Sequence, residues 1–150
     1  MKYFEDVRVG DTAALGSRTV TEEEILRFGR AYDPQPFHTD PDAAAGSLFG
    51  GLIASGWHTC AITMRLSVEA MQRDGLAGMG SPGIDSCRWL KPVRPGDTLT
   101  LTREIVETWP SRTKPFGFVR SRSQMTNQAG EAVLTIVGVT MIARRPESSR

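Results

Sequence analysis

The sequence has little cysteine and histidine, two of each, and no hydrophobic run long enough to span a bilayer. Two cysteines, Cys60 and Cys87, do not make the disulfide framework of a small secreted domain, so free thiols are expected. A charged start followed by an apolar segment, the pattern of a secretion signal, is also absent. These absences indicate a protein of the reducing cytoplasm without a membrane partner.

An excess of charge of either sign is missing as well. Lys and Arg number 18 against 17 Asp and Glu, which gives a formal net charge of +1. This balance gives no electrostatic reason to expect nucleic acid as a partner. Five arginines gather late in the sequence: Arg112, Arg120, Arg122, Arg144 and Arg145. Such a cluster indicates either a solvated face or a site for an anionic ligand such as a nucleotide-bearing thioester.

Two helices have clear start signals. Thr21 to Glu24 has the form of a capping box and predicts a helix that ends before Pro34. Ser55 is a good N-cap for a longer helix that extends to about residue 71. Its large apolar residues recur every three or four positions and predict a stripe buried in the core: Trp57, Ala61, Met64, Val68 and Met71.

After residue 84 the apolar period changes to two, which is typical of strands. Strands are expected at about 12–19, 84–90, 98–109, 116–127 and 131–143. Together with the long helix they predict one α+β domain over residues 1–150, an antiparallel β-sheet wrapped around a central helix, with a frayed tail from about residue 146. Open sheet edges and uncovered apolar surface favour a homodimer or a dimer of dimers.

The candidate acid–base residues are Asp33 and His38. The segment that joins them contains Pro34 and Pro36, so we expect it to be extended and stiff. A carboxylate held against an imidazole fixes its tautomer and raises its basicity, so the pair can take a proton from water and return it. The D-x-x-x-x-H pattern alone is weak, because an Asp before proline usually forms a turn and a lone His is usually structural.

Ser55 and Gly56 stand at the head of the long helix, where unpaired amides and the helix dipole favour negative charge. Gly56 has no Cβ, so a substrate carbonyl could approach its N–H closely. An acid–base pair together with an oxyanion donor is what the addition of water to an α,β-unsaturated thioester requires.

Two competing site chemistries are weakly supported. Asp33, His38, His58 and Cys60 could be combined into a zinc site, but no H-x-x-x-H or C-x-x-C pairing supports one, so no metal is expected. Serine hydrolysis is also disfavoured, because no serine lies in a nucleophile-elbow context.

Three stretches resemble the MaoC-like dehydratases, the (R)-specific enoyl-CoA hydratase group. They are FGRAYDPQPFHTDP at 28–41, FGGLIASG at 49–56 and LKPVRPGDTL at 90–99. The resemblance implies a hot-dog fold, dimers and acyl-CoA substrates. It assigns Asp33 and His38 to the water and the Gly56 amide to the oxyanion.

The chain departs from this family at Gln35, where active members often have Asn. The extra methylene shifts the amide, which bears on substrate preference or water placement. Gln35, Ser55 and His58 are the expected substrate-binding residues. Two alternatives stay open: Ser55 only caps the helix, or His58 lies on the exposed part of the helix instead of facing the substrate channel.

The prediction is therefore an acyl-CoA hydratase that adds water reversibly to a trans-2-enoyl-CoA to give an (R)-3-hydroxyacyl-CoA. It needs no cofactor, because coenzyme A is part of the substrate. A thioesterase on the same scaffold is one alternative. A non-catalytic acyl-CoA-binding or regulatory domain that keeps the motif residues is the other.

Overall fold

The computed structural model describes residues 1–147. Its elements in chain order are η1 (Phe4–Asp6), β1 (Thr12–Thr19), α1 (Glu22–Tyr32), α2 (Pro36–Thr39), α3 (Pro41–Ala45), α4 (Gly56–Asp74), β2 (Gly83–Trp89), β3 (Thr98–Pro110), β4 (Phe116–Thr126) and β5 (Ala132–Ala143). All five expected strands are confirmed to within one residue at each end. Of the tail that we expected to fray, Pro146 and Glu147 have no regular structure, and residues 148–150 lie outside the described part.

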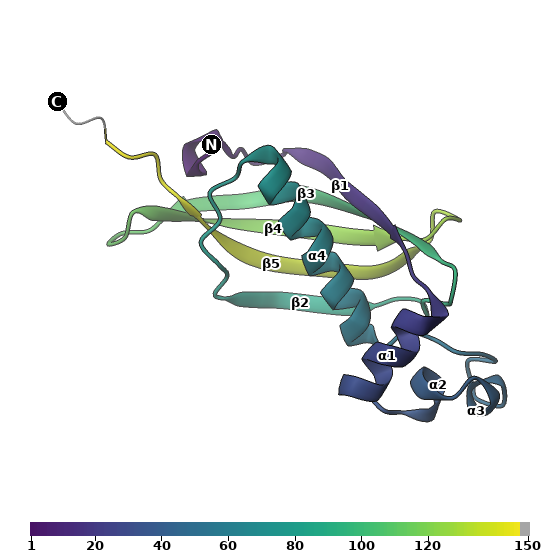
Figure 1. Cartoon of the computed structure of the whole chain (residues 1–150). Coiled ribbons are helices and arrows are strands. Elements are labelled where there is room, and N and C mark those ends of the chain that lie inside the picture. The colour runs from purple at the N-terminus through teal and green to yellow at the C-terminus, as the bar shows by residue number, and fades with distance from the viewer. Residues whose placement is uncertain (148–150) are drawn as a thin grey trace.

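The five strands form one antiparallel sheet in the order β1-β3-β4-β5-β2. The sheet curves around α4, and the three shorter helices gather beside the first turn of α4 (Figure 1). β1 approaches α4 closely at Gly16, where an added Cβ would lie 3.3 Å from Cδ2 of Leu66 and where φ is +144°. A side chain is therefore disfavoured at this contact. The arrangement confirms the expected α+β hot-dog fold.

The main core fills the space between α4 and the inner face of the sheet. Its most deeply buried residues come from four strands (β1, β3, β4 and β5), from the residue after β1 and from α1: Leu15, Val20, Ile25, Leu99, Leu101, Met125, Val133 and Leu134. Leu99 and Leu101 alternate with threonines along β3, as the period of two predicts. This core anchors the end of the molecule at which α1, α2 and the start of α4 meet.

The predicted buried stripe of α4 is wrong for the single chain. Trp57 is 63% exposed, Met64 60% and Val68 39%. The buried face instead carries Ile62, Leu66, Ala70 and several polar residues: His58, Thr59 and Thr63. Threonine can occupy a buried helix face because its hydroxyl bonds back to the preceding turn, as Thr63 does to the Thr59 carbonyl at 3.0 Å. Apolar residues lie on both faces of this helix, so their spacing alone did not identify the inner one.

The expectation of an extended segment from Asp33 to His38 is only partly correct. Gln35 is extended, with φ −73° and ψ 145°, but α2 begins at Pro36 and contains His38. The fixed φ of proline fits the first position of a helix, where the missing N–H is not needed. His38 is therefore positioned by a short helix, which also places it on the inner side of the chain, 4% exposed.

The capping box at the start of α1 supports a stability prediction. The Glu24 amide donates to Thr21 Oγ1 at 3.1 Å, and the Thr21 amide donates to Glu24 Oε2 at 3.3 Å. We expect Thr21→Ala to lower the free energy of unfolding by about 1 kcal/mol, because it removes the cap. Urea denaturation measures the change, and Thr21→Ser, which keeps the hydroxyl, is the control. Equal losses in both variants would contradict a capping role.

Candidate active site

Asp33 and His38 are brought together where α1 ends and α2 begins. Asp33 is the C-cap of α1, and its Oδ2 lies 3.2 Å from Nε2 of His38. The His38 Nδ1 lies 2.7 Å from the Ile53 carbonyl oxygen, which can only accept, so Nδ1 carries a proton. This bond leaves Nε2 as the basic nitrogen, directed at the carboxylate. A proton can therefore be exchanged between the two groups and a bound water.

The Asp33 carboxylate is held by two further side chains. Ser55 Oγ donates to Oδ2 at 2.7 Å, and Gln35 Nε2 donates to Oδ1 at 2.8 Å. Partial burial acts to raise the pKa of Asp33, but these hydrogen bonds and the nearby His38 outweigh it, so the pKa of Asp33 is lowered. The carboxylate is thus charged and oriented at neutral pH.

Ser55 links this carboxylate to the head of α4. The side chain is completely buried, and Oγ also accepts the Trp57 amide at 3.3 Å, as an N-cap does. Capping is therefore one of two contacts that this residue makes. Gln35 likewise contacts Asp33 directly. The side chains of Gln35 and Ser55 are thus both hydrogen-bonded to the same carboxylate.

Gly56 is the first residue of α4, and no acceptor within residues 1–147 pairs with its amide. The indole of Trp89 lies against this residue, since an added Cβ would be 2.5 Å from Cε2 and Nε1 of that ring. Trp89 also makes an edge contact with Trp57, with ring centroids 5.4 Å apart. The free amide thus lies beside an aromatic pair.

The three family-like stretches meet around one cleft of about 380 Å³. The first contributes Asp33, Gln35, Phe37 and His38, the second Phe49, Ile53, Ala54 and Gly56, and the third Leu90, Lys91, Pro92 and Val93. Backbone hydrogen bonds join them, from the Ile53 amide to the Phe37 carbonyl at 3.1 Å and from the Ala54 amide to the Val93 carbonyl at 2.8 Å. The candidate acid–base pair and the candidate oxyanion donor therefore face the same space.

Sequence reasoning missed the aromatic part of this cleft. Trp57 and Trp89 line this part of the cleft, and Lys91 lies in the lining as well. None of the three was expected there. Trp57 was assigned to the core stripe of α4. Trp89 reaches the cleft because β2 pairs with β5, with Trp89 opposite Leu134. No local pattern in the sequence indicates that register.

His58 is not among the residues that line this cleft. It is 7% exposed and stacks on Phe28, with ring centroids 4.9 Å apart and an interplanar angle of 7°. Burial lowers the pKa of His58, with Glu24 acting in the opposite direction, and its Nδ1 has no partner within residues 1–147. His58 therefore lies outside the cleft lining, and the alternative of an exposed position is wrong.

The late arginines do not form one free anion site. Arg120 pairs with Asp85 at 2.8 Å and also with Glu107. The other pairs are Arg122 with Glu104 at 3.5 Å, Arg144 with Glu5 at 3.2 Å and Arg145 with Asp6 at 2.8 Å. Four of the five arginines are thus engaged by carboxylates, which favours the reading as a charged surface.

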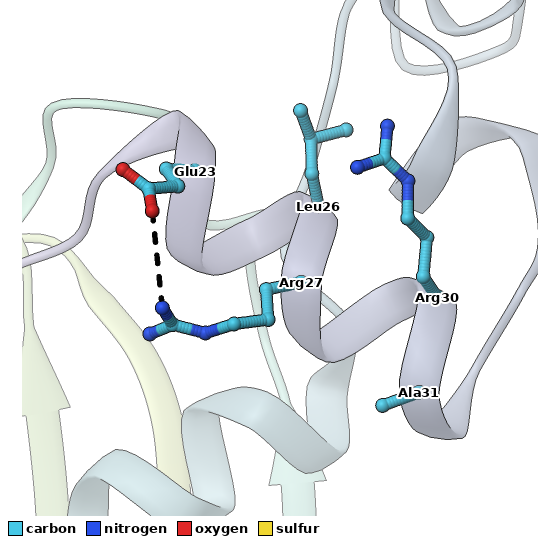
Figure 2. Close-up of a pocket in the computed structure, with 5 residues that line it drawn as sticks. All are labelled: Glu23, Leu26, Arg27, Arg30 and Ala31. Atoms are coloured by element: carbon cyan, nitrogen blue, oxygen red, sulfur yellow. Dashed lines mark ion pairs between the residues drawn. The ribbon is translucent and has the colours of Figure 1, made fainter.

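A shallow hollow on α1 also lacks the groups for catalysis. It is lined by Glu23, Leu26, Arg27, Arg30 and Ala31 from this helix alone. Figure 2 shows Arg27 directed at Glu23, 3.9 Å away, and Arg30 directed elsewhere. The hollow offers one weak surface ion pair and no acid–base couple.

Over residues 1–147 no group of three or more His, Cys, Asp or Glu side chains is suited to hold a metal ion. Cys60 and Cys87 are free, as expected, with their sulfurs 3.7 Å apart. Burial raises the pKa of Cys60 to about 12, so the thiol stays protonated. In the same part of the chain no helix combines the length and the apolarity needed to cross a membrane.

Comparison with known proteins agrees with the arrangement of the cleft. The family model described as MaoC like domain matches residues 6–125. The chain belongs to this family. A crystal structure of the MaoC-like dehydratase from Rhodospirillum rubrum superposes with a TM-score of 0.88 at 40% identity, covering 97% of this chain and 99% of that one. The resemblance seen in the three sequence stretches is thereby confirmed.

Two curated relatives of the MaoC-like chain differ in length. The (R)-specific enoyl-CoA hydratase of Rhodospirillum rubrum is 30% identical over 147 residues, which cover 97% of this chain and 94% of the relative. Protein MaoC of Klebsiella aerogenes is 35% identical over 111 residues, 71% of this chain but only 32% of that longer protein. The sequence of nearly the whole chain is thus matched by a relative of similar size.

The contact between Gly56 and Trp89 supports a packing prediction. We expect Gly56→Ala to lower the free energy of unfolding by about 1–3 kcal/mol, because the new methyl overlaps the indole. The shift of tryptophan fluorescence and urea denaturation measure it. In a Trp89→Ala background the loss should disappear. A loss of the same size in both backgrounds would show that the strain comes from the helix start instead.

The buried His58 supports a pH prediction. The pKa of His58 is lowered in the folded state, whereas in the unfolded chain it has its ordinary value of 6.5. The unfolded chain therefore binds more protons as the pH drops through and below 6.5, and the free energy of unfolding falls. Arg18 and Arg27 act in the same direction as burial, and Glu24 opposes them. His58→Phe keeps the ring stack but cannot titrate, so its melting temperature should fall less between pH 7.5 and about pH 5. An equal fall in melting temperature in the wild type and in His58→Phe would refute the assignment of this pH dependence to His58.

Proposed function

We propose that this MaoC-like chain is a hydro-lyase that adds water reversibly to a trans-2-enoyl-CoA and gives an (R)-3-hydroxyacyl-CoA. One observation carries the proposal: a carboxylate–imidazole pair and an unpaired helix-head amide line the same cleft. The similarity to relatives such as the (R)-specific enoyl-CoA hydratase supports the same reaction class.

In the proposed reaction Asp33 and His38 hold one water. Its oxygen bonds to the β-carbon of the enoyl group, the α,β double bond becomes an enolate, and the water proton passes to the pair. The Gly56 amide donates to the thioester oxygen while that oxygen carries the negative charge. The pair then returns a proton to the α-carbon, so that one water adds overall and no cofactor is consumed.

Gln35 and Ser55 are positioning residues in this proposal. Each donates to one oxygen of Asp33, at 2.8 and 2.7 Å, so the carboxylate cannot rotate without losing a hydrogen bond. Gln35, which stands where active family members often have Asn, reaches the carboxylate through this hydrogen bond from Nε2 to Oδ1 of Asp33. We do not place His58 in the mechanism, because it packs on Phe28 outside the cleft.

A second copy of the chain is part of the proposal. The outer stripe of α4 exposes Trp57, Met64 and Val68, and β2 lies at the edge of the sheet with Ile84 58% exposed and Trp89 47% exposed. Apolar surface next to an open strand edge favours pairing with an identical subunit. A homodimer built on this surface would lie beside the mouth of the cleft, because both tryptophans line it.

Asp33→Asn tests the assigned chemistry. The change keeps the volume but removes the charge that orients His38, so turnover of crotonyl-CoA should fall at least about a hundredfold. Loss of absorbance of the enoyl thioester measures the rate. Asp42→Asn, on the exposed first turn of α3, is the matched control and should stay near wild type.

Three results would count against the proposal. Near-wild-type turnover of Asp33→Asn would remove the acid–base role. Release of free thiol without loss of the enoyl group would indicate a thioesterase. Tight binding of acyl-CoA with neither reaction would indicate a binding domain.

A further inference from the structure

A second cavity of about 460 Å³ lies between the later part of α4 and the inner face of the sheet. Figure 1 shows α4 crossing this face from the end near α1 toward the end near the N-terminus. The cavity belongs to the second of these ends, since η1, the start of β1 and the last turns of α4 contribute to its walls. It is distinct from the cleft that holds Asp33.

An arginine interrupts the apolar inner row of β3. Leu99, Leu101 and Ile105 are buried and alternate with outward residues, and Arg103 occupies the inward position between them. Its partner across the ladder on β4 is Ser123, and Ser121 is opposite Ile105. A strand with one face on a core should not carry a charge at such a position without a partner.

No carboxylate within residues 1–147 lies within 4.0 Å of the Arg103 side-chain nitrogens. Burial lowers the pKa of Arg103, while Asp74 and Asp11 act from a greater distance to raise it. Both carboxylates already have other partners, Asp74 with Arg73 at 3.3 Å and Asp11 with the Arg8 amide at 3.0 Å. The half-buried guanidinium thus keeps donors free for a ligand.

Further hydroxyls surround the same space. Thr63 and Ser67 from α4 line the cavity with Ser121 and Ser123 from β4. Three carboxylates also line it, those of Asp6, Asp11 and Asp74, and apolar side chains form much of the remaining wall. An arginine fork with neighbouring hydroxyl donors is typical of carboxylate recognition, and the apolar remainder suits a hydrocarbon chain.

The cavity lies next to the cleft along α4. Thr59 lines the cleft and Thr63 lines the cavity, four residues or about 6 Å farther along the same face of α4. On β5 the corresponding pair is Val133 in the cleft and Ile136 in the cavity. From Gly56 to Ser67 the distance along the helix is about 16 Å, which requires an acyl chain of medium length.

We propose that the preferred substrate is an enoyl-CoA whose acyl chain ends in a carboxylate, and that Arg103 with Ser121 and Ser123 binds this terminal group. The methylene chain occupies the apolar part of the cavity, and the thioester lies at Gly56. This inference rests on the proposed hydratase function, since it places the acyl group of that substrate.

Binding of unreactive ligands tests the inference without catalysis. Isothermal titration calorimetry compares dodecanoyl-CoA with its analogue that carries a terminal carboxylate. We expect the carboxylate analogue to bind about ten- to a hundredfold more tightly to the wild-type protein, the gain from hydrogen bonds to a charged group. Arg103→Met should abolish this preference. Arg122→Met, an outward arginine of β4 that pairs with Glu104, is the matched control and should keep it.

The outcomes separate the two proposals. Equal or tighter binding of dodecanoyl-CoA by the wild type would overturn the carboxylate site, whatever happens to Arg103→Met. A lowered melting temperature of Arg103→Met with an unchanged preference would show a structural role instead and would also overturn it. If Arg103→Met does not fold, Arg103→Lys keeps the charge but loses the fork and should show a reduced preference; an undiminished one contradicts the inference.

Hydration of crotonyl-CoA is measured in parallel, because this short substrate cannot reach Arg103. Hydration without a carboxylate preference would remove the present inference and leave the proposed function intact. A carboxylate preference without hydration of any enoyl-CoA would remove the proposed function and support the binding site by itself.

Discussion

The hydrogen bond from Ser55 to Asp33 is the contact on which the site depends. Ser55 caps α4 and at the same time donates to the carboxylate that faces His38, at 2.7 Å. The acid–base pair and the helix-head amide of Gly56 are thereby fixed relative to each other through one buried side chain. Because the cap has no freedom to move without opening the helix, the geometry of the cleft follows from the position of α4.

Local signals in the sequence predicted most of the fold. The capping box at Thr21 set the start of α1, Pro34 set its end, and alternation located the four later strands to within one residue. Asp33, His38 and Gly56 were predicted as a group from a motif and from helix-end chemistry, and the structure brings them to one cleft. Each of these predictions rests on residues close in the sequence or on one short-range physical rule.

Predictions that depended on tertiary contacts, such as which face of a helix is buried or how two strands are aligned, were less successful. Apolar residues occur all round α4, so the spacing of Trp57, Met64 and Val68 could not distinguish the inner face from the outer one. The contact of Trp89 with Gly56 requires the register of β2 on β5, which no local residue encodes. His58 packs on Phe28 because α1 and α4 meet there, a tertiary contact without a sequence signature.

The distribution of polar and apolar residues on α4 links stability with function. Hydroxyl groups such as that of Thr63 are buried beside Ile62 and Leu66, while Met64 and Val68 are exposed. A helix gains most from burying its apolar face, so the single chain leaves part of this free energy unused. The hydroxyls of the inner face line the same cavity as Arg103 and Ser123 on the sheet, where the proposed carboxylate would bind. Covering the outer stripe with a second subunit would recover the lost burial, so association and the internal cavity are two consequences of one helix.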